Sequence, residues 1–301
     1  MKQSKSLGAW IFEIVNVLIM LVVIAITLYP FVYVLMASFS DSIQLQAFRG
    51  ILLWPIGFST GGYKIVLSDR AIGIGYLNTL FYVFVGTFLN VAVTSMLAYV
   101  MVQKNYLLKN FITWMVILSM FFNGGLIPTF LVVRQLGLYN SVWAVILTTL
   151  VSTWNLIVMK SNFSQIPASL IESARIDGAN DVTILFRIVM PVSKAIIAVM
   201  VLYYAVGHWN SFYNALLYIR DRDLYPLQLV LRDILITQKT MLANIDPSQG
   251  AEVVEWAARR AYLAEAMKYS VIFIASAPLL IAYPFVQKYF VKGVMIGSVK
   301  E

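Results

Sequence analysis

Long apolar runs alternate with shorter polar segments along the whole chain. Six stretches free of Asp, Glu, Lys and Arg reach about 19 residues or more, roughly the length that a helix needs to cross a hydrocarbon core of about 30 Å. Backbone polar groups in lipid need partners within their own segment, and the alternation typical of a barrel strand is missing. We therefore predict an all-α integral membrane protein, with residues 1–301 as a single transmembrane domain. Its six transmembrane helices are expected at residues 14–36, 76–102, 111–133, 141–159, 195–219 and 269–287.

Composition agrees with a membrane protein and excludes several other classes. Hydrophobic residues make up 60% of the chain, charged residues only 12%, and the mean hydropathy is +0.81, so a soluble surface could not be built. The basic residues behind the net charge of +8 are scattered between apolar runs, and no nucleic-acid partner is expected. Since the chain has no cysteine and one histidine, we expect no disulfide and no metal site.

The orientation of the chain does not follow from its charges. An even number of spans places both termini on one side, but the Lys and Arg residues divide evenly between the two sides. The positive-inside rule therefore gives only a weak preference for cytoplasmic termini.

The loop between the fourth and fifth spans, residues 160–194, has the pattern of two short helices separated by a glycine. Pro167 suits the first turn of the first helix. Gly178 suits a left-handed helix end, which glycine adopts without strain. The second helix is expected at residues 181–190, ending at Pro191.

The same loop resembles the EAA loop of ABC import permeases, whose pattern is Glu-Ala-Ala, three residues, Gly, nine residues and Ile-x-Leu-Pro. Two positions depart from this pattern, with Ser173 in place of alanine and Met190 in place of leucine. An ordinary amphipathic cytoplasmic loop is the alternative interpretation. The residues that match the motif or its carbohydrate-importer version are Glu172, Ala174, Asp177, Gly178, Ala179, Phe186, Ile188 and Pro191.

The resemblance implies a type I ABC importer permease of the bacterial plasma membrane, with a cytoplasmic coupling helix that docks onto an ATPase. It implies four kinds of partner: a second permease subunit, two ABC ATPase subunits, an extracellular solute-binding protein and a carbohydrate substrate. Membrane lipid would surround the spans. This chain has no G-x-x-x-x-G-K-[ST] motif, so we expect it to be no enzyme and to hold no cofactor, with ATP and Mg²⁺ bound by the ATPases.

Weaker similarities extend from about Tyr29 onward to carbohydrate permeases of the maltose type, specifically the partner with a C-terminal tail. The ending, residues 283–301, looks closest to the subgroup for complex oligosaccharides or polysaccharides. That resemblance implies that the tail, residues 288–301, reaches the ATPases, and the alternative is a frayed terminus. The tail residues expected to contact the ATPases are Gly297, Ser298 and Lys300.

Residues 220–268 form a long segment that we expect on the extracytoplasmic side. Within it, residues 251–268 contain good helix formers and predict an outside helix before the sixth span. This helix could receive the binding protein or serve as a structural cap, and the sequence favours neither.

A sugar pathway needs hydrogen-bonding side chains and flat aromatic faces. The fifth span is richest in both, and Trp209 and Tyr213 would share one face of a continuous helix. The alternatives are an aromatic belt at the membrane interface, polar packing between helices, or a pathway that belongs wholly to the other permease. The candidate pathway residues are Tyr204, His208, Trp209, Asn210 and Tyr213, with Asn123 and Asn155 from neighbouring spans.

Three rival functions remain beside carbohydrate import. One is an ABC permease for a non-sugar solute. Another is a secondary transporter, but the six spans contain no Asp, Glu, Lys or Arg to carry ion coupling. The third is an intramembrane enzyme, for which the same spans supply no catalytic carboxylate.

Overall fold

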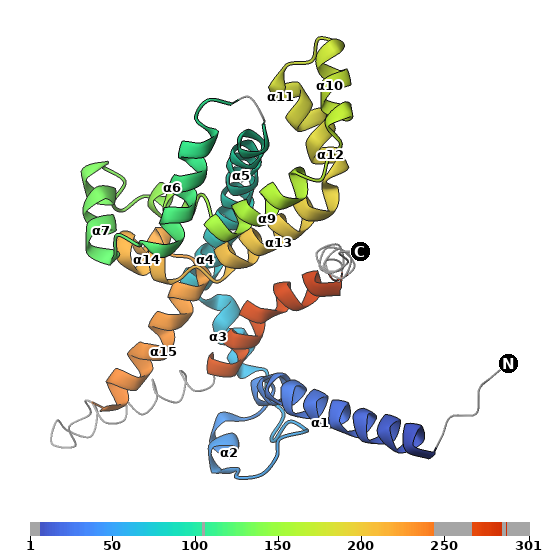
Figure 1. The fold of residues 1–301 in the computed structure, drawn as a ribbon. Helices are drawn as coiled ribbons and strands as arrows, with labels where there is room; N and C mark the ends of the chain where they lie inside the picture. The colour runs from blue at the N-terminus through green and yellow to red at the C-terminus, as the bar shows by residue number, and fades with distance from the viewer. Residues whose placement is uncertain (1–6, 104–105, 244–266, 285–286, 288–301) are drawn as a thin grey trace. The chain divides into compact units, whose positions relative to one another are not determined.

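The computed structural model describes residues 7–103, 106–243, 267–284 and 287, and for residues 237–243 the backbone alone. Over these residues every regular element is a helix, which confirms the predicted all-α fold class (Figure 1). The chain divides into two compact units. One contains Met1–Asp69 and Asp233–Ser276, and the other contains Arg70–Arg232 and Ala277–Glu301.

The first unit begins with the long helix α1 (Leu7–Ser38). Its side chains are apolar on all sides, and only Ala37 and Ser38 near its end are buried. A helix that exposes apolar surface around its whole circumference has the character of a membrane span. The sequence predicted this span at residues 14–36, and the helix starts seven residues earlier.

Two short helices follow α1 within the first unit, α2 (Ser42–Ala47) and α3 (Gly61–Ser68). The Ser38 hydroxyl lies 2.7 Å from the Tyr63 hydroxyl on α3. The Ser270 hydroxyl donates to the Ser38 carbonyl over 3.3 Å. These bonds hold the end of α1 against its neighbours in this unit.

The second unit is organised around a continuous helix from Arg70 to Val102. This helix comprises α4 (Arg70–Phe81), a π-helical turn η1 (Tyr82–Gly86) and α5 (Thr87–Val102). It matches the predicted second span at residues 76–102. Helix α5 packs against α9 (Thr153–Phe163) and α13 (Lys194–Trp209).

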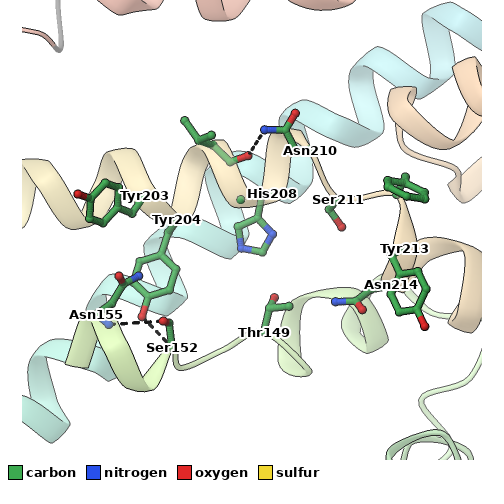
Figure 2. A pocket seen from close by; sticks show the side chains of 13 residues that line it. Thr149, Ser152, Asn155, Tyr203, Tyr204, His208, Asn210, Ser211, Tyr213 and Asn214 are labelled. Atoms are coloured by element: carbon green, nitrogen blue, oxygen red, sulfur yellow. Dashed lines mark hydrogen bonds between the residues drawn. The ribbon is translucent and has the colours of Figure 1, made fainter. Parts of the chain in front are cut away.

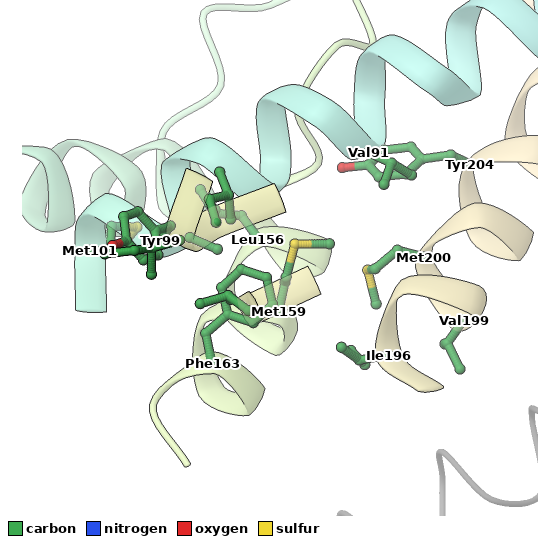
Figure 3. Close-up of a cluster of buried hydrophobic side chains, with 14 of the residues drawn as sticks. Val91, Tyr99, Met101, Leu156, Met159, Phe163, Ile196, Val199, Met200 and Tyr204 are labelled. Atoms are coloured by element: carbon green, nitrogen blue, oxygen red, sulfur yellow. The ribbon is translucent and has the colours of Figure 1, made fainter. Parts of the chain in front are cut away.

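A single hydrophobic core joins α5, α9 and α13 (Figure 3). Met101, Met159 and Met200, one from each helix, are at most 1% exposed. Met side chains are flexible and fill irregular gaps between packed helices. The bounds of the remaining labelled helices of this unit are α6 (Lys109–Phe121), α7 (Leu126–Gln135), α8 (Val142–Leu147), α10 (Ala168–Ile176), α11 (Asp181–Ile184), η2 (Leu185–Val189), α12 (Met190–Val192), α14 (Tyr213–Tyr218) and η3 (Arg222–Leu224), and α15 (Leu227–Ala243) continues into the first unit.

Three of the predicted spans are each divided into two helices in the structure. The span at 111–133 breaks between α6 and α7, where Gly125 adopts a φ of +86°. The span at 141–159 breaks between α8 and α9, and the span at 195–219 breaks between α13 and α14. Hydropathy measures apolar length, whereas local caps and turns decide where a helix ends.

Among the described residues, three helices are long and apolar enough to cross a membrane: Leu7–Ser38, Arg70–Val102 and Met267–Pro284. A fourth span results if Asp181–Val192 and Lys194–Trp209 are counted together, although they meet at a bend of 90°. The predicted tail contacts at Gly297, Ser298 and Lys300 lie outside the described residues. So do residues 251–266, most of the predicted outside helix.

Candidate coupling loop and translocation cavity

The predicted coupling loop is a pair of short helices, and the first of them, α10, has a tightly closed C-terminus. The Ala179 N–H donates to the Ala174 carbonyl over 2.9 Å, and the Gly178 N–H donates to the Arg175 carbonyl over 3.0 Å. These two bonds form a Schellman motif, which requires a residue with left-handed backbone angles directly after the helix. Gly178 supplies it with a φ of +82°, as the sequence predicted.

Pro167 precedes α10 as its N-cap and does not occupy the first helical turn as expected. Its ψ of 129° is extended, so the chain enters the helix one residue later. The second helix starts at Asp181, where the side chain of Asn180 accepts a bond of 2.8 Å from the Thr183 N–H. Asn180 is thus an N-cap residue of the second helix.

The two short helices rest on the same core as the membrane helices. Ala174 of α10 and Ile184, Leu185 and Val189 of the second helix are buried in the cluster that includes α5, α9 and α13. Because side chains in such a core are close-packed, a displacement of the loop must move the helices beneath it.

A polar cluster fastens the loop to the end of α5. The Arg175 guanidinium donates to the Asp181 carboxylate over 3.0 Å and to the side-chain carbonyl of Gln103 over 2.9 Å. The Tyr99 hydroxyl donates to the same Asp181 oxygen over 2.9 Å. The bonds from Arg175 and Tyr99 hold the pKa of the Asp181 carboxyl below its usual value.

Beside this cluster lies an open cleft of about 630 Å³ between the loop and the ends of α5 and α6. Glu172, Arg175 and Asp181 line it from the loop, and Gln103 and Lys109 line it from the ends of α5 and α6. The lining therefore carries charges of both signs.

The motif residues fall into an exposed group and a group that packs inward. Glu172, Ser173, Asp177, Gly178, Phe186 and Pro191 are exposed. Ala174 is buried, and Ala179 and Ile188 pack against the core. The exposed surface also includes two apolar side chains that the motif did not single out, Ile176 at 86% and Val182 at 65% exposure.

The charge of Asp181 is expected to contribute little to stability. Asp181→Asn keeps an oxygen acceptor but removes the charge, and the side chains of Asp181 and Arg175 are 65% and 46% exposed. We expect thermal unfolding in detergent to show a loss below about 1 kcal/mol. Since the carboxyl pKa is lowered, this stabilisation is present above the usual pKa and disappears only as pH falls through the lowered value.

Asp181→Ala removes the charge and both hydrogen bonds, so it should cost more than Asp181→Asn. An equal loss in the two variants would contradict this assignment of the hydrogen bonds.

The second feature is a cavity of about 570 Å³ in the second unit (Figure 2). It lies where α13 ends and faces the break between α8 and α9. Five of the seven predicted pathway residues line it: Tyr204, His208, Asn210, Tyr213 and Asn155. The cavity is also lined by Ser152, Tyr203, Ser211, Phe212 and Asn214, and by Thr149, which the sequence prediction missed.

Two buried polar pairs support the cavity from α5. The Asn90 amide donates to the carbonyls of Thr149 and Leu150 over 2.6 and 2.8 Å, and its oxygen lies 2.7 Å from Nε2 of His208. The Tyr204 hydroxyl lies 2.7 Å from the Thr94 hydroxyl. It also accepts a bond of 3.2 Å from the Ser152 N–H. Irregular backbone at membrane depth is tolerated where such partners satisfy it.

Two predicted pathway residues lie elsewhere. Trp209 is buried and packs edge-on against Tyr76 at a ring distance of 6.0 Å. Asn123 accepts a bond of 3.0 Å from the Gly125 N–H in the loop between α6 and α7. The predicted shared face of Trp209 and Tyr213 is wrong, because α13 ends at Trp209 and α14 begins at Tyr213.

An all-helical membrane fold with an exposed candidate coupling loop and a polar cavity is typical of a membrane transport component. The chain matches the family described as binding-protein-dependent transport system inner membrane component over residues 91–296, and it belongs to that family.

Curated relatives and a solved structure agree with this family. The chain is 40% identical to protein LplC of Bacillus subtilis over 96% of this chain and 95% of that protein. It is 38% identical to the polygalacturonan/rhamnogalacturonan transport system permease protein YtcP of the same organism, over 91% and 93%. A bacterial ABC transporter involved in the import of the acidic polysaccharide alginate contains a chain with a TM-score of 0.85. That chain is 29% identical, over 96% of this chain and 100% of its own length.

Proposed function

We propose that this chain is the permease subunit of an ABC importer that moves an oligosaccharide or polysaccharide across the plasma membrane. The carbohydrate assignment is supported by the functions of similar proteins, which include polygalacturonan/rhamnogalacturonan transport and alginate import. The cavity beside α13 adds support, because it offers hydroxyl, amide and aromatic side chains together.

The observation that carries the coupling role is the rigid attachment of α10. The helix exposes Glu172 and Ile176 to a partner, while Ala174 beneath them belongs to the core of the membrane helices. A helix that is exposed to a partner and packed against the membrane helices can transmit a movement of a docked ATPase to the cavity.

The same proposal fixes the assembly around the chain. Two ATPase subunits bind ATP and Mg²⁺ and hydrolyse the nucleotide, and this chain holds no cofactor. A second permease completes the pathway, and an extracellular binding protein delivers the sugar. The loop at residues 160–194 and both termini face the cytoplasm, where Gly297, Ser298 and Lys300 contact the ATPases.

Glu172→Lys tests the docking surface in the complex reconstituted with ATPases, second permease and binding protein. Reversing the charge of a residue in a docked interface disturbs the electrostatic complementarity on which the interface depends, at a cost of several kcal/mol. We therefore expect binding-protein-stimulated ATP hydrolysis and sugar uptake to fall by at least about tenfold. The chain itself should still insert, because Glu172 is exposed.

Asp223→Lys is the matched control, since Asp223 is an equally acidic and exposed residue in the segment predicted to be extracytoplasmic. It should leave ATP hydrolysis at the wild-type level. Wild-type uptake and hydrolysis in Glu172→Lys would show that α10 is not the docking helix.

A further inference from the structure

The hydrogen bonds of Asn90 determine which nitrogen of His208 carries the proton. The Asn90 amide nitrogen donates to two backbone carbonyls, and a flipped amide would place its oxygen against both of them. The Asn90 oxygen therefore accepts, and Nε2 of His208 donates to it. The neutral ring is held with its proton on Nε2, which leaves Nδ1 as an acceptor.

His208 presents that acceptor from the wall of the cavity. Figure 2 shows its ring between α13 and the segment that carries Thr149 and Ser152. The backbone at Gly86 packs closely against the ring, because a Cβ at that position would lie 2.4 Å from Nε2 of His208. The ring therefore has little freedom to turn.

The rest of the lining has a consistent chemistry. None of the described residues that line the cavity is Asp, Glu, Lys or Arg. Tyr203, Phe212 and Tyr213 are 40–51% exposed and offer flat aromatic surfaces. Asn210 and Asn214 add amides. Such a lining recognises hydroxyl groups and the apolar face of a sugar ring, but it offers no cation for a carboxylate.

We infer that this cavity is a binding site for an uncharged part of the transported carbohydrate, in which Nδ1 of His208 accepts a sugar hydroxyl. The inference rests on the proposed function and specifies the substrate chemistry at this subunit. A volume of about 570 Å³ falls within the usual size of small-ligand pockets, and it accommodates a short sugar segment.

The test uses the complete reconstituted complex, with galactotriose and trigalacturonate as probes. His208→Leu removes both nitrogen functions, whereas His208→Gln retains an N–H for Asn90 and an oxygen acceptor. Loss of one hydrogen bond should lower galactotriose uptake by about two- to tenfold in His208→Leu, with substantial recovery in His208→Gln. Binding-protein-stimulated ATP hydrolysis should change less than uptake, since the coupling loop is intact.

A second variant reports on charge selectivity. Asn214→Lys places a cation in the lining, so the ratio of trigalacturonate to galactotriose uptake should rise by about threefold or more. The inference would be overturned by wild-type uptake in His208→Leu, by equal losses in the Leu and Gln variants, or by an unchanged ratio in Asn214→Lys. The proposed function itself would be overturned if the wild-type complex showed no binding-protein-stimulated ATP hydrolysis and no sugar uptake, whereas the outcomes above overturn this inference alone.

Discussion

Gly178→Pro is expected to abolish coupled transport while leaving the chain in the membrane. Proline fixes φ near −65°, whereas Gly178 has a φ of +82°, and proline also lacks the N–H that donates to Arg175. It further disfavours the helical backbone of the preceding Asp177. The combined local cost is about 3 kcal/mol or more, so the end of α10 should unravel.

The measurement is uptake and binding-protein-stimulated ATP hydrolysis in proteoliposomes, together with co-purification of the ATPase subunits. A cost of about 3 kcal/mol corresponds to a loss of roughly a hundredfold in a coupled equilibrium. Because Gly178 has open space around its Cα, no buried contact is lost. Insertion should therefore remain close to the wild-type level.

Gly137→Pro is a close control because Gly137 closes α7 in the same way. Its φ is +70°, its N–H donates to Arg134, and the next N–H, that of Leu138, donates to Val133. The local strain is therefore matched, but the site lies outside the coupling loop. We expect Gly137→Pro to retain the ATPase subunits. If both variants lost the ATPase subunits equally in co-purification, α10 would have no specific role in ATPase docking.

Local sequence patterns were sufficient to predict the two short helices of the loop at residues 160–194 and the left-handed backbone of Gly178. The left-handed glycine and the helix pair depend on neighbours a few residues apart. The hydrogen bonds that attach the loop to the end of α5 could not be predicted from local patterns, because Tyr99 and Gln103 lie more than 70 residues from their partners in the sequence. Only the folded chain brings such groups together.

The cavity was predicted in part for a similar reason. Polar and aromatic composition indicated the correct end of the fifth span, but Trp209 is buried against Tyr76, and the helix break that follows it separates it from the helix of Tyr213. The contribution of Thr149 depends on a second break, between α8 and α9. Hydropathy does not register either break, since both segments remain apolar overall.

Gly86→Ala should impair the protein through a clash with one residue, His208. An added Cβ would lie 2.4 Å from the imidazole, which is buried and held by Asn90. Overpacking of this kind costs about 1–3 kcal/mol, or forces the ring toward the cavity. We expect a lower thermal stability in detergent and a loss of carbohydrate uptake of roughly tenfold.

Gly73→Ala is the control on the same continuous helix, because a Cβ at Gly73 meets nothing within 4 Å. Alanine is favoured over glycine within a helix by about 0.5–1 kcal/mol, so this variant should be neutral or slightly more stable. A lower stability in Gly86→Ala together with an unchanged or higher stability in Gly73→Ala would show that the loss comes from the clash and not from helix propensity.

The double variant Gly86→Ala with His208→Ala decides whether the imidazole is the cause. Removing the ring empties the space that the new methyl group enters, so the two changes should be strongly non-additive in stability. The double variant should be about as stable as His208→Ala alone, yet uptake should stay low because the acceptor is missing. If the stability losses of the two single variants simply added in the double variant, Gly86 would act through a contact other than His208. If uptake returned in the double variant, His208 would have no part in the pathway.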